Sequence, residues 1–293
     1  MEMFIAQLIN GISSGSIYAL VALGYTMVYG IVKLINFAHG DVIMVGSFII
    51  YLMVRTVGLP FIPAVLLAMA GCALLGVAME KIAYKPLRNA TRLSALITAI
   101  GVSLFLQNAF MVIFRPDPRP FPALSLPGSV RIFGYVTVSY LAIVTISVSV
   151  LMMVLLHVFV KSTKVGKAMR AVSEDSGAAS LMGVNVNRTI AVTFAIGSAL
   201  AAVGSALYAS TFPLVEPFMG LNLGLTAFVA AVLGGIGTIP GAMLGGFLLG
   251  IIESMTRAYI STQLSDAVVF SILIFVLLIK PSGLMGKTVR EKV

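Results

Sequence analysis

Residues 137–160 read TVSYLAIVTISVSVLMMVLLHVFV and contain no Asp, Glu, Lys or Arg. As a helix this run would be about 36 Å long, enough to cross a hydrocarbon core of about 30 Å. Its apolar residues are continuous rather than alternating, which favours a helix over a barrel strand. In hydrocarbon only helices and closed barrels satisfy the backbone, so we predict a transmembrane helix here.

Similar runs recur along the whole chain. The composition is 59% hydrophobic and 10% charged, with a mean hydropathy of +1.08, whereas soluble domains carry about 25% charged residues. We therefore predict one all-α transmembrane domain over residues 1–293, a polytopic helical bundle of about eight to nine spans with Gly-rich broken or short helices. The predicted spans are 5–31, 42–58, 60–79, 93–114, 137–160, 190–210, 222–236, 239–256 and 265–280.

The basic residues predict the orientation. Lys33, the loops 80–92 and 161–189, and the tail carry 14 Lys and Arg residues, and the segments on the other side carry 5. The positive-inside rule places the richer side, including the C-terminus, in the cytoplasm. Nine spans then leave the N-terminus outside. The net charge of +9 thus sets topology in a bacterial plasma (inner) membrane and does not indicate nucleic-acid binding.

The stretch 222–256 is rich in glycine and is barely long enough for two spans. We predict two short helices that meet at residues 237–241. Gly241/Gly245 and Gly246/Gly250 would form close-packing faces. The alternative is a helix break that lines the substrate pathway. That alternative would use Gly234, Gly235 and Gly237.

Residues 30–41 read GIVKLINFAHGD and form the densest polar cluster beside a hydrophobic run. One interpretation is an ordinary turn, with Gly40 at the bend and Asp41 starting the next helix. The other is a helix interruption whose free backbone groups face the pathway. Under the second interpretation the candidate pathway residues are Asn36, His39, Gly40 and Asp41.

The loop 161–189 contains start and stop signals for a short helix over 174–182. Ser173 would cap it, Glu174 and Asp175 would occupy its first turn, and Gly183 would end it in the left-handed conformation. Its surface is small and apolar, which predicts docking into a partner. The candidate docking residues are Gly177, Ala178, Ala179, Leu181 and Met182, in addition to Glu174, Asp175 and Gly183.

Enzymatic patterns are incomplete. Residues 11–15 (GISSG) match a serine-hydrolase spacing, but the chain has only two histidines, His39 and His157. Residues 281–288 (PSGLMGKT) nearly spell a phosphate-binding loop, but Pro281 replaces its first glycine. We therefore expect no catalytic residues, no metal site, no cofactor and no nucleotide site in this chain.

Four segments together resemble the membrane permeases of branched-chain amino-acid ABC importers, of the LivH type. They are 30–47 (GIVKLINFAHGDVIMVGS), 166–185, 231–250 (AVLGGIGTIPGAMLGGFLLG) and 280–286 (KPSGLMG). The resemblance implies a second homologous permease, two cytoplasmic ATPases that use the ATP, and an extracytoplasmic substrate-binding protein. It also implies that 174–182 contacts the ATPases, although Gly177 stands where this family usually has Glu.

We therefore expect a permease subunit that moves leucine, isoleucine and valine inward. A related permease for urea, short amides or a sugar is the nearer alternative. An ion-coupled transporter working alone is the more distant one, because it would need carboxylates within the membrane. The sequence places the relevant carboxylates, Glu80, Glu216, Glu253 and Asp266, at span ends.

Overall fold

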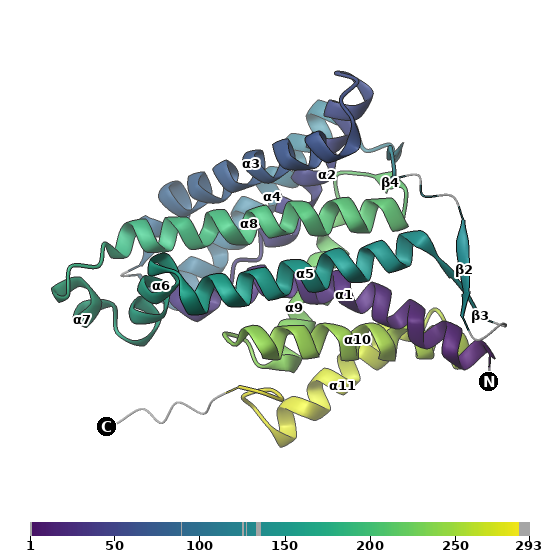
Figure 1. The fold of residues 1–293 in the computed structure, drawn as a ribbon. Helices are drawn as coiled ribbons and strands as arrows, with labels where there is room; N and C mark the ends of the chain where they lie inside the picture. The colour runs from purple at the N-terminus through teal and green to yellow at the C-terminus, as the bar shows by residue number, and fades with distance from the viewer. Residues whose placement is uncertain (1, 89, 125, 127, 133–135, 287–293) are drawn as a thin grey trace.

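The computed structural model describes residues 2–88, 90–124, 126, 128–132 and 136–286, and within them the chain is a helical bundle (Figure 1). Every predicted span corresponds to a helix. The nine helices are α1 (Glu2–Val32), α2 (His39–Arg55), α3 (Phe61–Met79), α4 (Arg92–Phe114), α5 (Tyr140–Ser162), α8 (Val186–Thr211), α9 (Met219–Gly234), α10 (Ile239–Tyr259) and α11 (Ser265–Ile279).

Helix length separates these helices into two groups. In the described part of the chain, six helices are long and apolar enough to cross a bilayer by themselves. The other three, α2, α9 and α11, have 17, 16 and 15 residues. The predicted bundle with several short helices is therefore confirmed.

Shorter elements lie at the two ends of the bundle. The π-helix η1 (Glu80–Tyr84) and the 3-10 turn η2 (Lys85–Leu87) extend α3, and α6 (Lys164–Glu174) and α7 (Ser176–Leu181) follow α5. Strand β1 (Arg119–Pro120) pairs antiparallel with β4 (Leu214–Val215), and β2 (Ser129–Ile132) pairs with β3 (Val136–Ser139). Helices α6 and α7 lie at one end, whereas β2, β3 and the N-terminus lie at the other (Figure 1).

The bundle has two central helices. In the most apolar window of α1, 78% of residues are buried, and in that of α8, 72% are buried. The corresponding share is 22% in α3 with its extension, in α4 and in α5. Large apolar side chains on these outer helices, including Leu66, Leu74, Phe105 and Leu155, are exposed. Because no described residue covers them, these faces are suited to lipid or to a partner helix.

The helices form two inverted repeats, α1–α4 and α8–α11. Each contains a long helix, an interruption, a short helix and a third helix. The third helix has an Ile-Pro pair in its first turn, which starts at Ile62 in α3 and at Ile239 in α10. Equivalent helices of the two repeats make equivalent contacts. The first helix of each repeat lies along the third helix of the other, α1 on α10 and α8 on α3. The short helix packs between these two helices in the same way, α2 on α3 and α8, and α9 on α10 and α1. Antiparallel contacts between α1 and α8, with Gly24 near Gly197 and Val21 near Gly204, invert one repeat relative to the other.

Both predicted glycine faces of α10 are used. Gly241 and Gly245 face α9, where a Cβ on Gly245 would meet Gly234 N at 2.7 Å. Gly246 and Gly250 face α1, where they contact Ala19 and Gly15. Close backbone approach of this kind is a common basis of helix association in membranes. It also explains the glycines of GISSG, because a Cβ on Gly11 would lie 2.7 Å from Ile251 Cα.

Candidate functional site

The interruption between α1 and α2 brings the chain back into the bundle. Residues 33–38 are not helical, and Lys33 takes a positive φ of 57°. Helix α2 then starts at His39, whose ring lies so close to Gly24 of α1 that a Cβ there would collide with it. The chain is therefore broken between α1 and α2, as both interpretations required. Asp41 lies in the first turn of α2, but Gly40 is helical and does not form the bend that the turn interpretation placed there.

A second interruption separates α8 from α9, between the predicted spans 190–210 and 222–236. Residues 212–218 return the chain from the end of α8, and α9 begins at Met219 beside the start of α2. A Cβ on Gly224 would lie 2.8 Å from Gly40 Cα and 3.1 Å from the Tyr25 hydroxyl, and Gly220 also contacts Gly40. The first turns of α2 and α9, which occupy equivalent places in the two repeats, therefore touch backbone to backbone. Broken helices of this kind form substrate sites in other transporters.

The polar side chains of the first interruption are buried and held by distant helices. The Tyr84 hydroxyl donates to Asn36 Oδ1 at 2.7 Å. Gln107 Nε2 of α4 donates to Asp41 Oδ1 at 2.9 Å and also contacts Ser103 Oγ at 3.1 Å. The His39 ring stands edge-on to Tyr25, with centroids 4.8 Å apart. The interruption is therefore a layer of buried polar side chains, held by hydrogen bonds and ring contacts from other helices, within an apolar bundle.

A cavity of about 200 Å³ opens at this layer between α1, α2, α4 and α9. Its polar lining comes from Tyr25, Asp41, Ser103 and Gln107, and its apolar lining includes Leu104, Leu221 and Leu225. Of the predicted pathway residues, Gly40 and Asp41 line it, whereas Asn36 and His39 lie behind it. An apolar cavity with a few convergent polar groups can hold a small amphiphilic solute. We name it the Asp41 cavity.

The glycine break lies between Gly234 and Ile239, so Pro240 and Gly241 belong to α10 and not to the break predicted at 237–241. Helix α10 has 21 residues and is therefore not one of two short helices.

The break serves mainly for packing. Gly235 and Gly237 have φ values of 108° and 95°, which side chains rarely adopt. Gly234 contacts Gly241, and Gly235 contacts Gly286 of the C-terminal segment. That segment is fixed to α9 because Leu284 N and Met285 N donate to Leu233 O and Gly234 O, each at 2.9 Å.

Only Gly237 of the three predicted pathway glycines lines a cavity in the described structure. This cavity, of about 90 Å³, also includes Gly30 of α1 and Arg170 and Ser173 of α6. The glycine break therefore lies beside α6. Lys287 and Thr288, the last residues of the near phosphate-loop pattern, lie outside the described residues.

The loop 161–189 forms two helices and not the single helix predicted over 174–182. Thr163 caps α6, which packs through Gly166, Met169 and Val172. Asp175 separates the helices, and its side chain accepts from Ala178 N at 2.9 Å to cap α7. Ser173 was predicted to be the cap, but it lies inside α6 and donates to Arg170 O at 2.7 Å. The spacing of Met169 and Val172 after a capping Thr was the signal for α6 in the sequence.

The end of α7 matches its prediction. Gly183 has a φ of 83°, and Gly183 N and Val184 N donate to Ser180 O and Ala179 O, each at 3.0 Å. Leu181 and Met182 are 90% and 85% exposed, but Ala179 is only 4% exposed. Ala179 therefore packs within its own chain and is not free to dock, which corrects its assignment. The exposed apolar surface consists of Gly177, Ala178, Leu181 and Met182.

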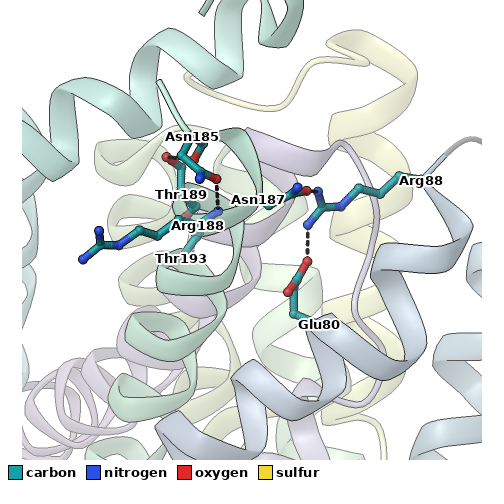
Figure 2. A network of polar contacts seen from close by, with 7 residues as sticks. All are labelled: Glu80, Arg88, Asn185, Asn187, Arg188, Thr189 and Thr193. Carbon is teal, nitrogen blue, oxygen red and sulfur yellow. Dashed lines mark hydrogen bonds and ion pairs between the residues drawn. The ribbon is translucent and has the colours of Figure 1, made fainter. Parts of the chain in front are cut away.

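A polar network joins this end of the bundle to central helix α8 (Figure 2). Arg88 pairs with Glu80 and donates to Asn187 Oδ1 at 2.5 Å. Asn185, directly after α7, caps α8 by accepting from Arg188 N at 3.0 Å. Movement of α7 would therefore be passed to α8 through its first turn.

The acidic residues near helix ends are buried. Glu80 directly follows Met79, the last residue of α3, and Glu253 lies in the second half of α10, which ends at Tyr259. Both therefore lie near span ends, as predicted, but both are buried, and so is Asp41. The sequence did not show this burial, because hydropathy reports the ends of apolar runs and not which neighbouring helices cover them.

Comparison with known proteins identifies the family. The model of the family described as "Branched-chain amino acid transport system / permease component" matches residues 7–277. The chain belongs to this family. It is 44% identical to the high-affinity branched-chain amino acid transport system permease protein BraD of Pseudomonas aeruginosa, over 99% of this chain and 98% of that protein.

Two further relatives are also named as branched-chain amino acid transport permeases. The chain is 42% identical to the high-affinity branched-chain amino acid transport system permease protein LivH of Escherichia coli K12, over 99% of this chain and 98% of that protein. It is 28% identical to a probable branched-chain amino acid transport permease protein LivH of Methanocaldococcus jannaschii, over 92% and 89%. No solved structure gave a significant match.

Proposed function

We propose that this chain is the permease subunit of an ATP-driven importer that carries leucine, isoleucine and valine into the cell. Its relatives at 42–44% identity, matched over nearly their full length, are named for branched-chain amino acid transport. This likeness is the observation that carries the proposal. It favours branched-chain amino acids over urea, short amides or a sugar.

The partners follow from the resemblance and from the surface of α7. A second homologous permease would complete the path, two cytoplasmic ATPases would bind the α6–α7 end, and an extracytoplasmic protein would deliver the solute. The ATP would be used by the partners alone. The basic loops 80–92 and 161–189 meet at one end through Arg88 and Asn187, so a single orientation places both, with the C-terminus, in the cytoplasm.

The two repeats suggest how the path would open and close. The Asp41 cavity lies where α2 and α9, one from each repeat, meet at Gly40 and Gly220. A small rotation of one repeat against the other would change access to it. Movement of α7 would be passed to α8 through Asn185. It would also be passed to the glycine break, through α6. Both effects would favour one rotation of the repeats over the other.

Reconstitution tests the proposal. In proteoliposomes this chain alone should take up no leucine, with or without a sodium or proton gradient, whereas the complete complex with ATP should take it up. Robust uptake by the chain alone under an ion gradient would favour the ion-coupled alternative. Failure of the complete complex to accumulate any branched-chain amino acid would contradict the proposal.

Two variants locate the coupling and the pathway. Leu181→Asp should abolish co-purification of the ATPases, while Thr262→Asp, at another exposed site on the turn between α10 and α11, should not. Asp41→Ala should lower uptake while the complex still assembles, because it removes the carboxylate that lines the cavity. Normal transport by Leu181→Asp with its ATPases still bound would contradict the docking role of α7.

A further inference from the structure

A second, larger cavity lies towards the opposite end of the bundle from α6 and α7. Its volume is about 240 Å³, and it is enclosed by α1, α8, α9, α10 and α11. Arg257 in the last turn of α10 and Asp266 in the first turn of α11 mark its outer side. In the proposed orientation this end faces the delivering binding protein. We name it the Glu253 cavity.

Charged groups of both signs line this cavity. The Glu253 side chain is only 7% exposed and is paired with Arg257, whose side chain is 44% exposed. Asp266 lines the same cavity from α11, and Tyr18, Tyr208 and Asn222 add polar groups. Two carboxylates therefore share one guanidinium in this lining, which leaves an excess negative charge beside a cation. Ionisable groups inside membrane helices usually mark a functional pathway.

The Arg257 guanidinium has N–H donors that no described residue accepts from. Its guanidinium pairs with Glu253 through Nη2, and its Nε lies 3.4 Å from Ser265 Oγ. A guanidinium has five N–H donors in a planar fork that fits a carboxylate, so other donors remain for a bound anion. Glu253 and Asp266 can in turn accept from an ammonium group.

Apolar residues complete the lining. Leu225, Val269 and Phe270 face the cavity beside the charged groups. Leu225 also lines the Asp41 cavity, so a single side chain of α9 borders both. The two cavities therefore lie on either side of one residue of α9.

We propose that the Glu253 cavity binds a whole α-amino acid as a zwitterion at the outer end of the path. Glu253 and Asp266 take its ammonium, Arg257 takes its carboxylate, and Leu225, Val269 and Phe270 hold its aliphatic side chain. This inference rests on the proposed function and adds an outer site to it. A site for a metal cation would have no use for Arg257.

Cysteine protection tests binding directly. The only cysteine, Cys72, is buried, so Asn222→Cys in a Cys72→Ala background gives one reactive thiol in the cavity. In nanodiscs holding the complex without the binding protein, millimolar leucine should slow labelling by methyl methanethiosulfonate at least threefold. Leucinamide and 4-methylpentanoate, which each lack one charge, should slow it less than twofold. Gln263→Cys, exposed on the nearby turn, is the control and should show no protection.

Two results would overturn the site. Absence of protection by leucine would show that the cavity holds no amino acid. Equal protection by sodium in the absence of leucine would show that it is a cation site.

A charge swap separates binding from structure. The double variant Glu253→Arg/Arg257→Glu keeps an i,i+4 ion pair but exchanges the two charges. We expect it to retain the thermal midpoint of the wild type while leucine uptake falls at least tenfold. Uptake within twofold of wild type would show that the pair is structural and would overturn the inference.

Uptake by the wild-type complex keeps the two hypotheses distinguishable. If the wild type imports leucine and the swap does as well, only the outer site is wrong. If the wild type imports no branched-chain amino acid, the proposed function itself fails.

Discussion

Helices α3 and α10 occupy equivalent places in the two repeats, and each carries a buried glutamate near its end, paired with an arginine further along the chain. The Glu80 side chain is 2% exposed and its partner Arg88 is 18% exposed, with Asn187 of α8 completing the cluster. The Glu253 side chain is 7% exposed, but its partner Arg257 is 44% exposed and borders a cavity. Glu80 also lines a cavity, of about 440 Å³, so the two pairs differ mainly in the exposure of the arginine. We call the Glu80–Arg88 pair closed and the Glu253–Arg257 pair open.

The difference in arginine exposure shows that equivalent positions of two inverted repeats can take different roles. Each glutamate-bearing helix is also bonded to the central helix of the other repeat, α3 to α8 through Asn187 and α10 to α1 through Ser254, which donates to Gln7 O at 2.8 Å. At the α6–α7 end Arg88 joins Glu80 to Asn187 of α8, and its Nε is buried without a partner among the described residues, so this cluster holds the helices together and leaves little access to a solute. At the outer end the arginine keeps free donors, so it can bind a solute.

The largest expected effect is at the closed pair. Arg88→Ala should leave the buried Glu80 carboxylate without its partner, which costs about 3–5 kcal/mol of stability. The measurement is the thermal midpoint of the detergent-solubilised chain, compared with Lys85→Ala, an exposed lysine in the same turn. Adding Glu80→Gln should recover part of the loss, because the uncompensated charge is then removed. Equal midpoints for Arg88→Ala and Lys85→Ala would contradict the closed character of this pair.

An intermediate effect is expected where α10 meets α1. A Cβ on Gly250 would collide with the backbone at Gly15, so Gly250→Ala should destabilise by about 1–3 kcal/mol. Gly101→Ala is the matched control, because a Cβ at this helical glycine of α4 meets nothing within 4 Å. A Gly250→Ala midpoint no lower than that of Gly101→Ala would show that α10 is free to move away from α1.

The smallest effect on stability is expected at the open pair. Arg257→Ala should lower the unfolding free energy by ~1 kcal/mol or less, because the Arg257 side chain is 44% exposed and water screens its attraction to Glu253. Leucine uptake should nevertheless fall about tenfold if one charge-assisted hydrogen bond of ~1.5 kcal/mol is lost. A loss of stability as large as that of Arg88→Ala would erase the distinction between the two ends.

Much of the architecture could be predicted from the sequence. All nine spans, the α9–α10 break, the two glycine faces of α10 and the left-handed end at Gly183 follow from local patterns. These features are local because hydrocarbon forces each segment to satisfy its own backbone, and because only glycine readily adopts a positive φ. The resemblance to the family rested on motifs of the same local kind.

The sites depended more on tertiary contacts. Sequence reasoning found Gly40 and Asp41 but not Gln107, Tyr25 or Gly224, which come from other helices. It placed Glu253 at a span end and Ala179 on a docking surface, and both are buried. Burial is set by residues that are far away in sequence, so no local pattern reports it.

The sequence by itself thus determined that the chain is a membrane helical bundle, where its helices run, and which ends carry the basic loops. Only the tertiary structure decided that the helices form two inverted repeats and that Gly40 meets Gly220. It alone also showed that both glutamates are buried and that Arg257 is much more exposed than Arg88. The physical reason is that an apolar run fixes a helix locally, whereas a cavity exists only where several helices fail to fill the space between them.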